Sequence, residues 1–149
     1  MIKKYCISFL FVVCLVPFSA CSKQVPMSGK VTFSDDQSPL TCGTVFFETD
    51  TFQARGEIKP DGTYTIGTLS EKDGLPPGTY RVFVVGATAQ DPSVPPGPNR
   101  PPIILPLIDP KFETGRTSGL TVDVGPSTKK FDFSVDPNTT TKAKLEKQK

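Results

Sequence analysis

Residues 60–66 and 75–85 decide the fold, and they read PDGTYTI and LPPGTYRVFVV. Each segment begins with a turn made by proline and glycine, because proline fixes φ and glycine accepts the positive φ that tight turns require. Apolar and polar side chains then alternate, which is the period of a β-strand with one buried face. Phe83 and Val85 make the second face of the later segment apolar too, as in a central sandwich strand. The chain is therefore predicted to be built on strands.

Further segments alternate in the same way and are separated by turns that contain glycine or proline: residues 28–34, 43–49, 52–58, 119–124 and 130–135. Gly125-Pro126-Ser127 predicts a hairpin between the last two. We predict one all-β domain over residues 26–136, a single sandwich of about seven short antiparallel strands, transthyretin-like or Ig-like, with no helix after residue 20. Its expected core comprises Val31, Phe33, Val45, Phe47, Tyr64, Ile66, Val82, Val84, Leu120, Val122, Phe131 and Phe133.

The first twenty residues have the pattern of a signal peptide. Lys3 and Lys4 precede an apolar run over residues 7–16, which is shorter than the roughly 20 residues that a membrane-spanning helix needs. The run is followed by Phe18-Ser19-Ala20-Cys21, which resembles the lipobox of bacterial lipoproteins, where the cysteine is acylated and becomes the new N-terminus.

Phe18 stands where the lipobox usually has leucine, and it also suits an ordinary signal peptidase poorly, because that enzyme requires a small residue at this place. We predict that residues 1–20 are removed as a signal peptide, that Cys21 carries lipid, and that residues 21–25 form a short lipidated tether. The alternative is a secreted protein with Cys21 in a disulfide.

The residue types argue against catalysis. The sequence has no histidine, so neither a Cys–His nor a Ser–His–Asp site can form. Cys6 and Cys14 lie in the signal peptide, which leaves Cys42 as the partner of Cys21. If Cys21 is acylated, Cys42 has no partner, and its position at the start of a strand suits a small buried hydrophobe. We predict no enzyme activity, no metal and no cofactor.

The charge balance excludes another class of function. Without Lys3 and Lys4, the 17 basic residues of the sequence fall to fifteen, which equals the number of acidic residues. A formally neutral chain lacks the positive surface that nucleic-acid binding requires.

Asp35 and Asp36, in a turn, could supply oxygen ligands to calcium, but turn chemistry explains two adjacent aspartates as well.

Two segments fit no strand pattern. Residues 86–102 contain six prolines and are predicted to be an extended insertion, either a docking segment or a plain connection between strands. Residues 137–149 have four lysines and are predicted to be a basic disordered tail, either simply solvated or in contact with anionic lipid headgroups or an acidic wall polymer.

Four segments carry a resemblance to a known family: GKV at residues 29–31, PLTCGTV at 39–45, DGTY at 61–64 and LPPGTYRV at 75–82. They resemble the transthyretin-like, carboxypeptidase regulatory-like β-sandwich domains. With the lipobox and residues 109–112 and 117–122, the chain is similar to small planctomycete-type lipoproteins of that kind. The resemblance implies a β-sandwich over residues 26–135 in the cell envelope, and it brings no catalytic or binding residue.

These observations predict a lipoprotein held through Cys21 at a membrane outside the cytoplasm, with a non-catalytic structural or interaction module and an unidentified protein or wall-polymer partner. The alternative is a module that binds carbohydrate or a cell-wall polymer. A sugar binder would normally expose aromatic rings for stacking, but the sequence has no tryptophan, and Tyr64 and Tyr80 are expected to face inward.

Overall fold

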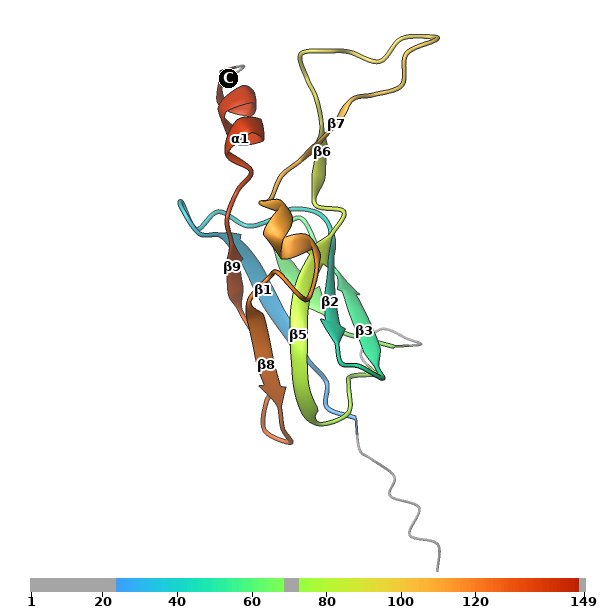
Figure 1. Ribbon diagram of the computed structural model, residues 1–149, viewed down its shortest axis with the longest axis vertical. Coiled ribbons are helices and arrows are strands. Elements are labelled where there is room, and N and C mark those ends of the chain that lie inside the picture. The colour runs from blue at the N-terminus through green and yellow to red at the C-terminus, as the bar shows by residue number, and fades with distance from the viewer. Residues whose placement is uncertain (1–23, 69–72, 148–149) are drawn as a thin grey trace, which may run out of the picture.

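A computed structural model describes residues 24–68 and 73–147, which form a sandwich of two facing sheets (Figure 1). The three-stranded sheet has the order β4 (Thr63–Thr65), β1 (Ser28–Phe33) and β9 (Phe133–Val135). The four-stranded sheet has the order β3 (Gln53–Glu57), β2 (Thr44–Glu48), β5 (Gly78–Val85) and β8 (Leu120–Val124). A separate ribbon pairs β6 (Thr88–Gln90) with β7 (Ile104–Pro106), and two short helices follow, η1 (Pro110–Glu113) and α1 (Thr139–Glu146).

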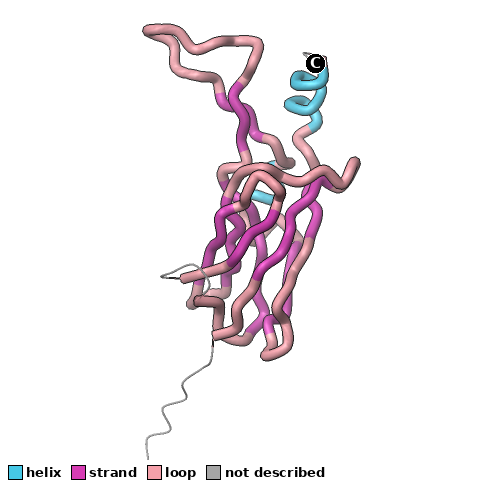
Figure 2. Tube along the Cα trace, turned by 180° about the vertical axis from the view of Figure 1, so that it is seen from behind, coloured by secondary structure: helices cyan, strands magenta, loops and turns pink. Residues whose placement is uncertain are grey.

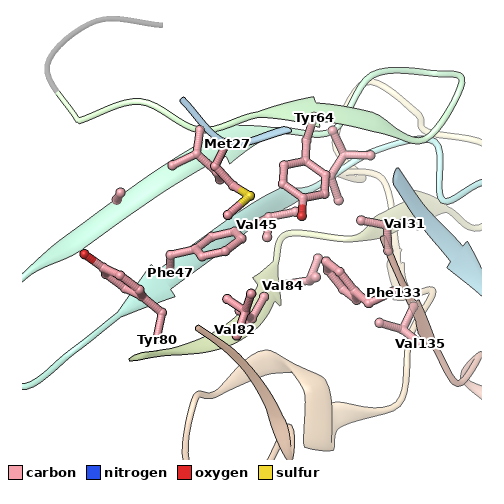
Figure 3. Packing of buried hydrophobic residues seen from close by; sticks show 14 of the residues in the cluster. Met27, Val31, Val45, Phe47, Tyr64, Tyr80, Val82, Val84, Phe133 and Val135 are labelled. Carbon is pink, nitrogen blue, oxygen red and sulfur yellow. The ribbon is translucent and has the colours of Figure 1, made fainter. Parts of the chain in front are cut away.

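The core lies between the two sheets and is centred on aromatic rings (Figure 3). The ring centroid of Phe47 lies 6.2 Å from that of Tyr64 and 6.3 Å from those of Tyr80 and Phe131. Nine of the twelve residues expected in the core are buried, and Phe33, Leu120 and Phe131 are partly buried against it. The all-β sandwich is therefore confirmed.

The expected hairpin after β8 is wrong. β8 pairs with β5 in one sheet, whereas β9 pairs with β1 in the other, and the β1–β9 pair is parallel rather than antiparallel. The turn at residues 125–128 thus carries the chain across the core from one sheet to the other. Alternation predicts only which side chains of a strand point into the core. Strands of both sheets point apolar side chains into the same core, so the pattern did not show which sheet β9 joins.

The expectation that no helix follows residue 20 and that the C-terminal tail is disordered is also wrong, because α1 occupies Thr139–Glu146. The side chain of Asn138 caps the helix by accepting a hydrogen bond from the Thr141 backbone N–H at 3.1 Å. Lys142 and Lys144 form ion pairs with aspartates of the sandwich and the β6–β7 ribbon. Capping and these tertiary contacts order a segment whose composition suggested a solvated coil.

Residues 88–106, which include most of the predicted extended insertion at residues 86–102, form a projecting arm (Figures 1 and 2). At its base Thr88, Ala89 and Gln90 pair with Pro106, Leu105 and Ile104. At its tip the N–H groups of Gly97 and Arg100 donate to each other's carbonyl oxygens at 3.1 and 3.0 Å. Pro106 lies in a ribbon with a free edge, where a residue without an N–H group is tolerated.

The two ends of the sandwich are different (Figures 1 and 2). The described chain begins beside β1 at one end, where the N–H of Val25 donates to the Leu75 carbonyl at 2.8 Å. The arm and α1 stand at the opposite end, which we call the apical end. Within residues 24–68 and 73–147, neither helix is long and apolar enough to cross a membrane.

Candidate functional site

The apical end has a cleft of about 540 Å³ between α1 and the base of the arm. We call it the apical cleft, and it is lined by Phe33, Asp36, Ser38, Pro92, Leu107, Pro137, Thr141, Lys142, Leu145 and Glu146. Phe33 and Leu107 also pack against the hydrophobic core, so the floor of the cleft is the outer boundary of that core. Its volume lies within the range of about 300–1,000 Å³ that is typical of ligand sites.

One wall of the apical cleft is fixed by the turn after β1. Asp36 accepts hydrogen bonds from the Ser38 backbone N–H at 2.9 Å and from the Ser38 hydroxyl at 2.6 Å. Lys142 of α1 reaches the same turn, where its ammonium group pairs with Asp35 and lies 3.3 Å from Asp36. The Ser38 hydrogen bonds, with a smaller contribution from Lys142, lower the pKa of Asp36 to about 2, so its carboxylate stays ionised.

A second ion pair joins α1 to the base of the arm. Asp91 is only 1% exposed and pairs with Lys144. It also accepts hydrogen bonds from the Ser93 backbone N–H at 3.0 Å and from the Ser93 hydroxyl at 2.5 Å. The hydrogen bond from Lys144, followed by those from Ser93, lowers the pKa of Asp91. A buried carboxylate needs such partners, because burying an unpaired charge is costly.

α1 is therefore held to the body mainly by polar contacts. Thr141 is the buried residue of the helix, while Leu145 is half-buried on the wall of the cleft. Apolar residues do not collect on one face of this helix, so burial of an apolar stripe does not explain its position. The two lysines and the Asn138 cap fix it instead, and they hold it beside an apolar floor.

The lipobox residues Phe18, Ser19, Ala20 and Cys21 lie outside the described residues. Cys42 precedes β2 and is half-buried rather than fully buried, with its thiol donating to the Thr88 carbonyl at 3.2 Å. The two aspartates considered for calcium are ion-paired with Lys142. Over residues 24–68 and 73–147, no group of three or more metal-ligating side chains comes together.

The aromatic residues are largely committed to packing. Tyr64 and Tyr80 are buried, as expected. Phe46, on the outer face of the four-stranded sheet, stacks on Phe83 with ring centroids 5.2 Å apart and an interplanar angle of 10°. Residues around Gly115 approach the same face, since a Cβ built on that glycine would lie 3.3 Å from the Phe83 ring. A broad exposed aromatic platform is not formed there.

Sequence reasoning missed the apical cleft. The cleft combines the turn after β1, the base of the arm and α1, which are separated by dozens of residues in the chain. Lys142 and Lys144 were visible as a basic tail, and Asp35, Asp36 and Asp91 as loop carboxylates. Nothing in the local pattern indicated that these charges pair with one another.

Comparison with known proteins identifies no family for this chain. No protein-family model and no curated protein matches the chain. Among solved structures it is similar to the major pilin subunit BcpA of Bacillus cereus, with 10% identity and a TM-score of 0.42 over 78% of this chain and 30% of the pilin. It is also similar to a 9R-lipoxygenase from Cyanothece, with 16% identity and a TM-score of 0.35 over 75% of this chain and 16% of that enzyme. The chain thus spans less than a third of either protein.

Proposed function

We propose that the chain is an extracytoplasmic lipoprotein, anchored through Cys21, whose sandwich is a non-catalytic interaction module with its binding surface at the apical end. The observation that carries this proposal is the opposite placement of the two ends of the fold. The described chain begins at one end, and the arm and α1 stand at the other (Figures 1 and 2). Residues of α1 and of the base of the arm line the apical cleft there.

Simple distances support this arrangement. Gln24, the first described residue, is three positions after Cys21, so the tether reaches at most about 11 Å. β5 runs towards the apical end. Its eight residues are about 26 Å long, because a strand rises about 3.3 Å per residue. An anchor at Cys21 would thus hold the basal end close to a membrane and present the apical cleft and the arm away from it. Two acyl chains, at about 0.8 kcal/mol per buried methylene, would make the attachment stable.

The state of the carboxylates beside the cleft supports a non-catalytic role. The pKa of Asp36 and that of Asp91 lie below the ordinary value, because hydroxyl groups and lysines donate hydrogen bonds to both. A general acid or base works best with a pKa near the operating pH. A catalytic carboxyl group would therefore have a raised pKa, whereas the pKa values of these two groups are lowered. Lys142 and Lys144 are ion-paired within the chain, so they are poorly suited to bind lipid headgroups or a wall polymer.

Mass spectrometry of the N-terminal peptide from the native protein tests the anchor. We expect an acylated Cys21, loss of membrane attachment in a Cys21→Ser variant, and unchanged attachment in a Cys42→Ser control. An unmodified N-terminal peptide, or a disulfide between Cys21 and Cys42, would contradict the proposal.

Site-specific photo-crosslinking tests the direction of the binding surface. A crosslinker at Asn99, in the arm tip, should capture a partner, whereas one at Lys129 should not. Both residues are exposed. Lys129 directly follows the turn between β8 and β9, which lies at the opposite end of the sandwich (Figure 1). Equal capture from the two positions would contradict an apical binding surface.

A further inference from the structure

The arm exposes apolar residues that its own chain does not cover. Every residue from Pro95 to Ile104 is exposed. Ile103 and Ile104 are 44% and 54% exposed, and Val85 is the other exposed large hydrophobic of the described residues, at 41%. Adjacent strand residues face opposite sides of a ribbon, so each face at the outer end of the β6–β7 ribbon exposes one isoleucine to solvent. Large exposed apolar side chains on a projecting element indicate a contact surface.

The arm is also ordered before any partner binds. Beyond the β6–β7 pairs, the Asp91 N–H donates to the Ile103 carbonyl at 2.8 Å, and the Gly97–Arg100 pair closes the tip. Prolines between these two points limit the conformations of the backbone. A segment that is already ordered loses little entropy on binding, which favours its use as a docking element.

The charges of the arm and of the apical cleft are complementary. Between Asp91 and Asp109 the only charged residue is Arg100, which is exposed near the arm tip. The cleft and the ion pairs at its rim contain four carboxylates against two ammonium groups, namely Asp35, Asp36, Asp91 and Glu146 against Lys142 and Lys144. Glu146 is exposed. An apolar segment with one cation thus matches an apolar floor with an excess of negative charge.

The arm cannot fill the cleft of its own chain. Pro92, at the base of the arm, forms part of the cleft wall, and the rest of the arm projects away from the sandwich (Figures 1 and 2). An arm from another molecule meets no such restriction. A symmetric pair of molecules can then use both arms and both clefts at once, and such a pair is closed, because each contact is made twice.

We propose that the apical cleft receives the arm of a second copy of this chain, so that two copies form a twofold-symmetric dimer through reciprocal arm-to-cleft contacts. This inference rests on the proposed function, which makes the apical end an interaction surface. A twofold axis along the long axis of the sandwich leaves both N-terminal ends on the same side, as anchoring in one membrane requires. Ile103 and Ile104 lie on opposite faces of the ribbon, so one of them then contacts the apolar floor. Arg100 lies against the acidic rim at Glu146.

Sedimentation velocity over a concentration series tests the dimer. The protein used is the chain from residue 21 onward with Cys21→Ser, and it contains all the described residues. We expect a monomer–dimer equilibrium. Replacing both Ile103 and Ile104 by serine should weaken dimerisation at least tenfold, because the apolar side chain that each arm places on the floor loses its burial. The matched control is Val85→Ser, which changes the other exposed large hydrophobic and should leave the equilibrium unchanged.

A charge exchange tests which surfaces meet. Arg100→Glu alone and Glu146→Lys alone should each weaken self-association about tenfold, since each change places like charges together at both contacts of the dimer. An equimolar mixture of these two variants should form a heterodimer, because one contact is then native and the other has its charges exchanged. Arg55→Glu, which reverses an exposed charge on β3, is the control for the arm variants.

A chain that stays monomeric at every concentration overturns the inference. A dimer that persists when both Ile103 and Ile104 are replaced by serine also overturns it. The same holds for a mixture of the Arg100→Glu and Glu146→Lys variants that stays monomeric. None of these outcomes affects the acylation of Cys21 or the capture of a partner at Asn99, so the proposed function would stand while the dimer would not. If Cys21 is unmodified and the chain still dimerises, the proposed anchoring fails and the arm-to-cleft contact remains.

Discussion

Replacing Gly29 by alanine should destabilise the protein strongly, because β1 has no room for a side chain at this position. A Cβ on Gly29 would lie 1.9 Å from the Phe131 carbonyl oxygen and 2.7 Å from the Tyr64 hydroxyl oxygen. These two atoms are hydrogen-bonded to each other at 2.5 Å, with the hydroxyl donating to the carbonyl. Burial raises the pKa of Tyr64 above its ordinary value, so the hydroxyl keeps its proton and remains the donor.

Two costs combine in this variant. Forcing extra volume into a packed core typically costs about 1–3 kcal/mol. Separating the hydroxyl of Tyr64 from the Phe131 carbonyl leaves buried polar groups without their partner, which costs a further 1–3 kcal/mol or so. We therefore expect a loss of about 2–6 kcal/mol in the free energy of unfolding. This is a large part of the roughly 5–15 kcal/mol that a domain has in total.

Urea unfolding followed by circular dichroism measures the loss. Gly78→Ala is the matched control, because a Cβ there meets its nearest neighbour at an ordinary 3.7 Å, and the change should stay within about 0.5 kcal/mol. In Tyr64→Phe the hydrogen bond is already absent, so the two changes combined should cost less than their sum. A Gly29→Ala variant as stable as the wild type would refute the pairing of β1 with β9.

Three further predictions concern the core and α1. Phe133→Ala should cost about 3–5 kcal/mol in a urea melt, because Phe133 is 8% exposed and contacts the rings of Tyr64 and Phe131; a loss below about 1 kcal/mol would mean that the ring is not packed. The pKa of Asp36 is lowered to about 2, mainly by its hydrogen bonds from Ser38, so its stabilising effect is present above about pH 4 and is lost as the pH falls towards 2. The protection of amides in the turn after β1 and in α1, taken relative to the intrinsic exchange rate at each pH, should fall over that window, and Asp36→Asn should flatten the dependence. Lys144→Met should accelerate exchange in α1, because it removes the partner of Asp91, whereas the exposed Lys147→Met should not; equal exchange in the two variants would show that the Lys144 ion pair does not hold the helix.

The local sequence pattern determined the positions of the strands. Turns of proline and glycine followed by alternating side chains placed β1, β2, β3, β5 and β8 within a residue or two of their observed bounds. Alternation also placed Tyr64, Val82 and Phe133 in the core. These features depend on near neighbours in the chain. A turn is set by a few adjacent residues, and the side chains of a strand alternate between its two faces.

Contacts between distant segments could not be predicted in this way. The pairing of β9 with β1 depends on Tyr64, Phe131 and Gly29 fitting together, and these residues come from three separate strand segments. The helix at Thr139–Glu146 forms because Asn138 caps it and because Asp91 and the turn after β1 supply carboxylates for its lysines. A sequence window of ten residues contains the lysines but not their partners.

The same division applies to function. The sequence by itself determined the β-sandwich class and the residues that predict export and an anchor at Cys21, since these are read from composition and from short motifs. Only the tertiary structure decided that a basic tail becomes a capped, ion-paired helix beside an apolar cleft, and that a proline-rich segment becomes an ordered arm. The physical reason is that charge pairing and apolar burial depend on distance in space, and the fold brings together Phe33, Asp91 and Lys144 from segments that the chain keeps far apart.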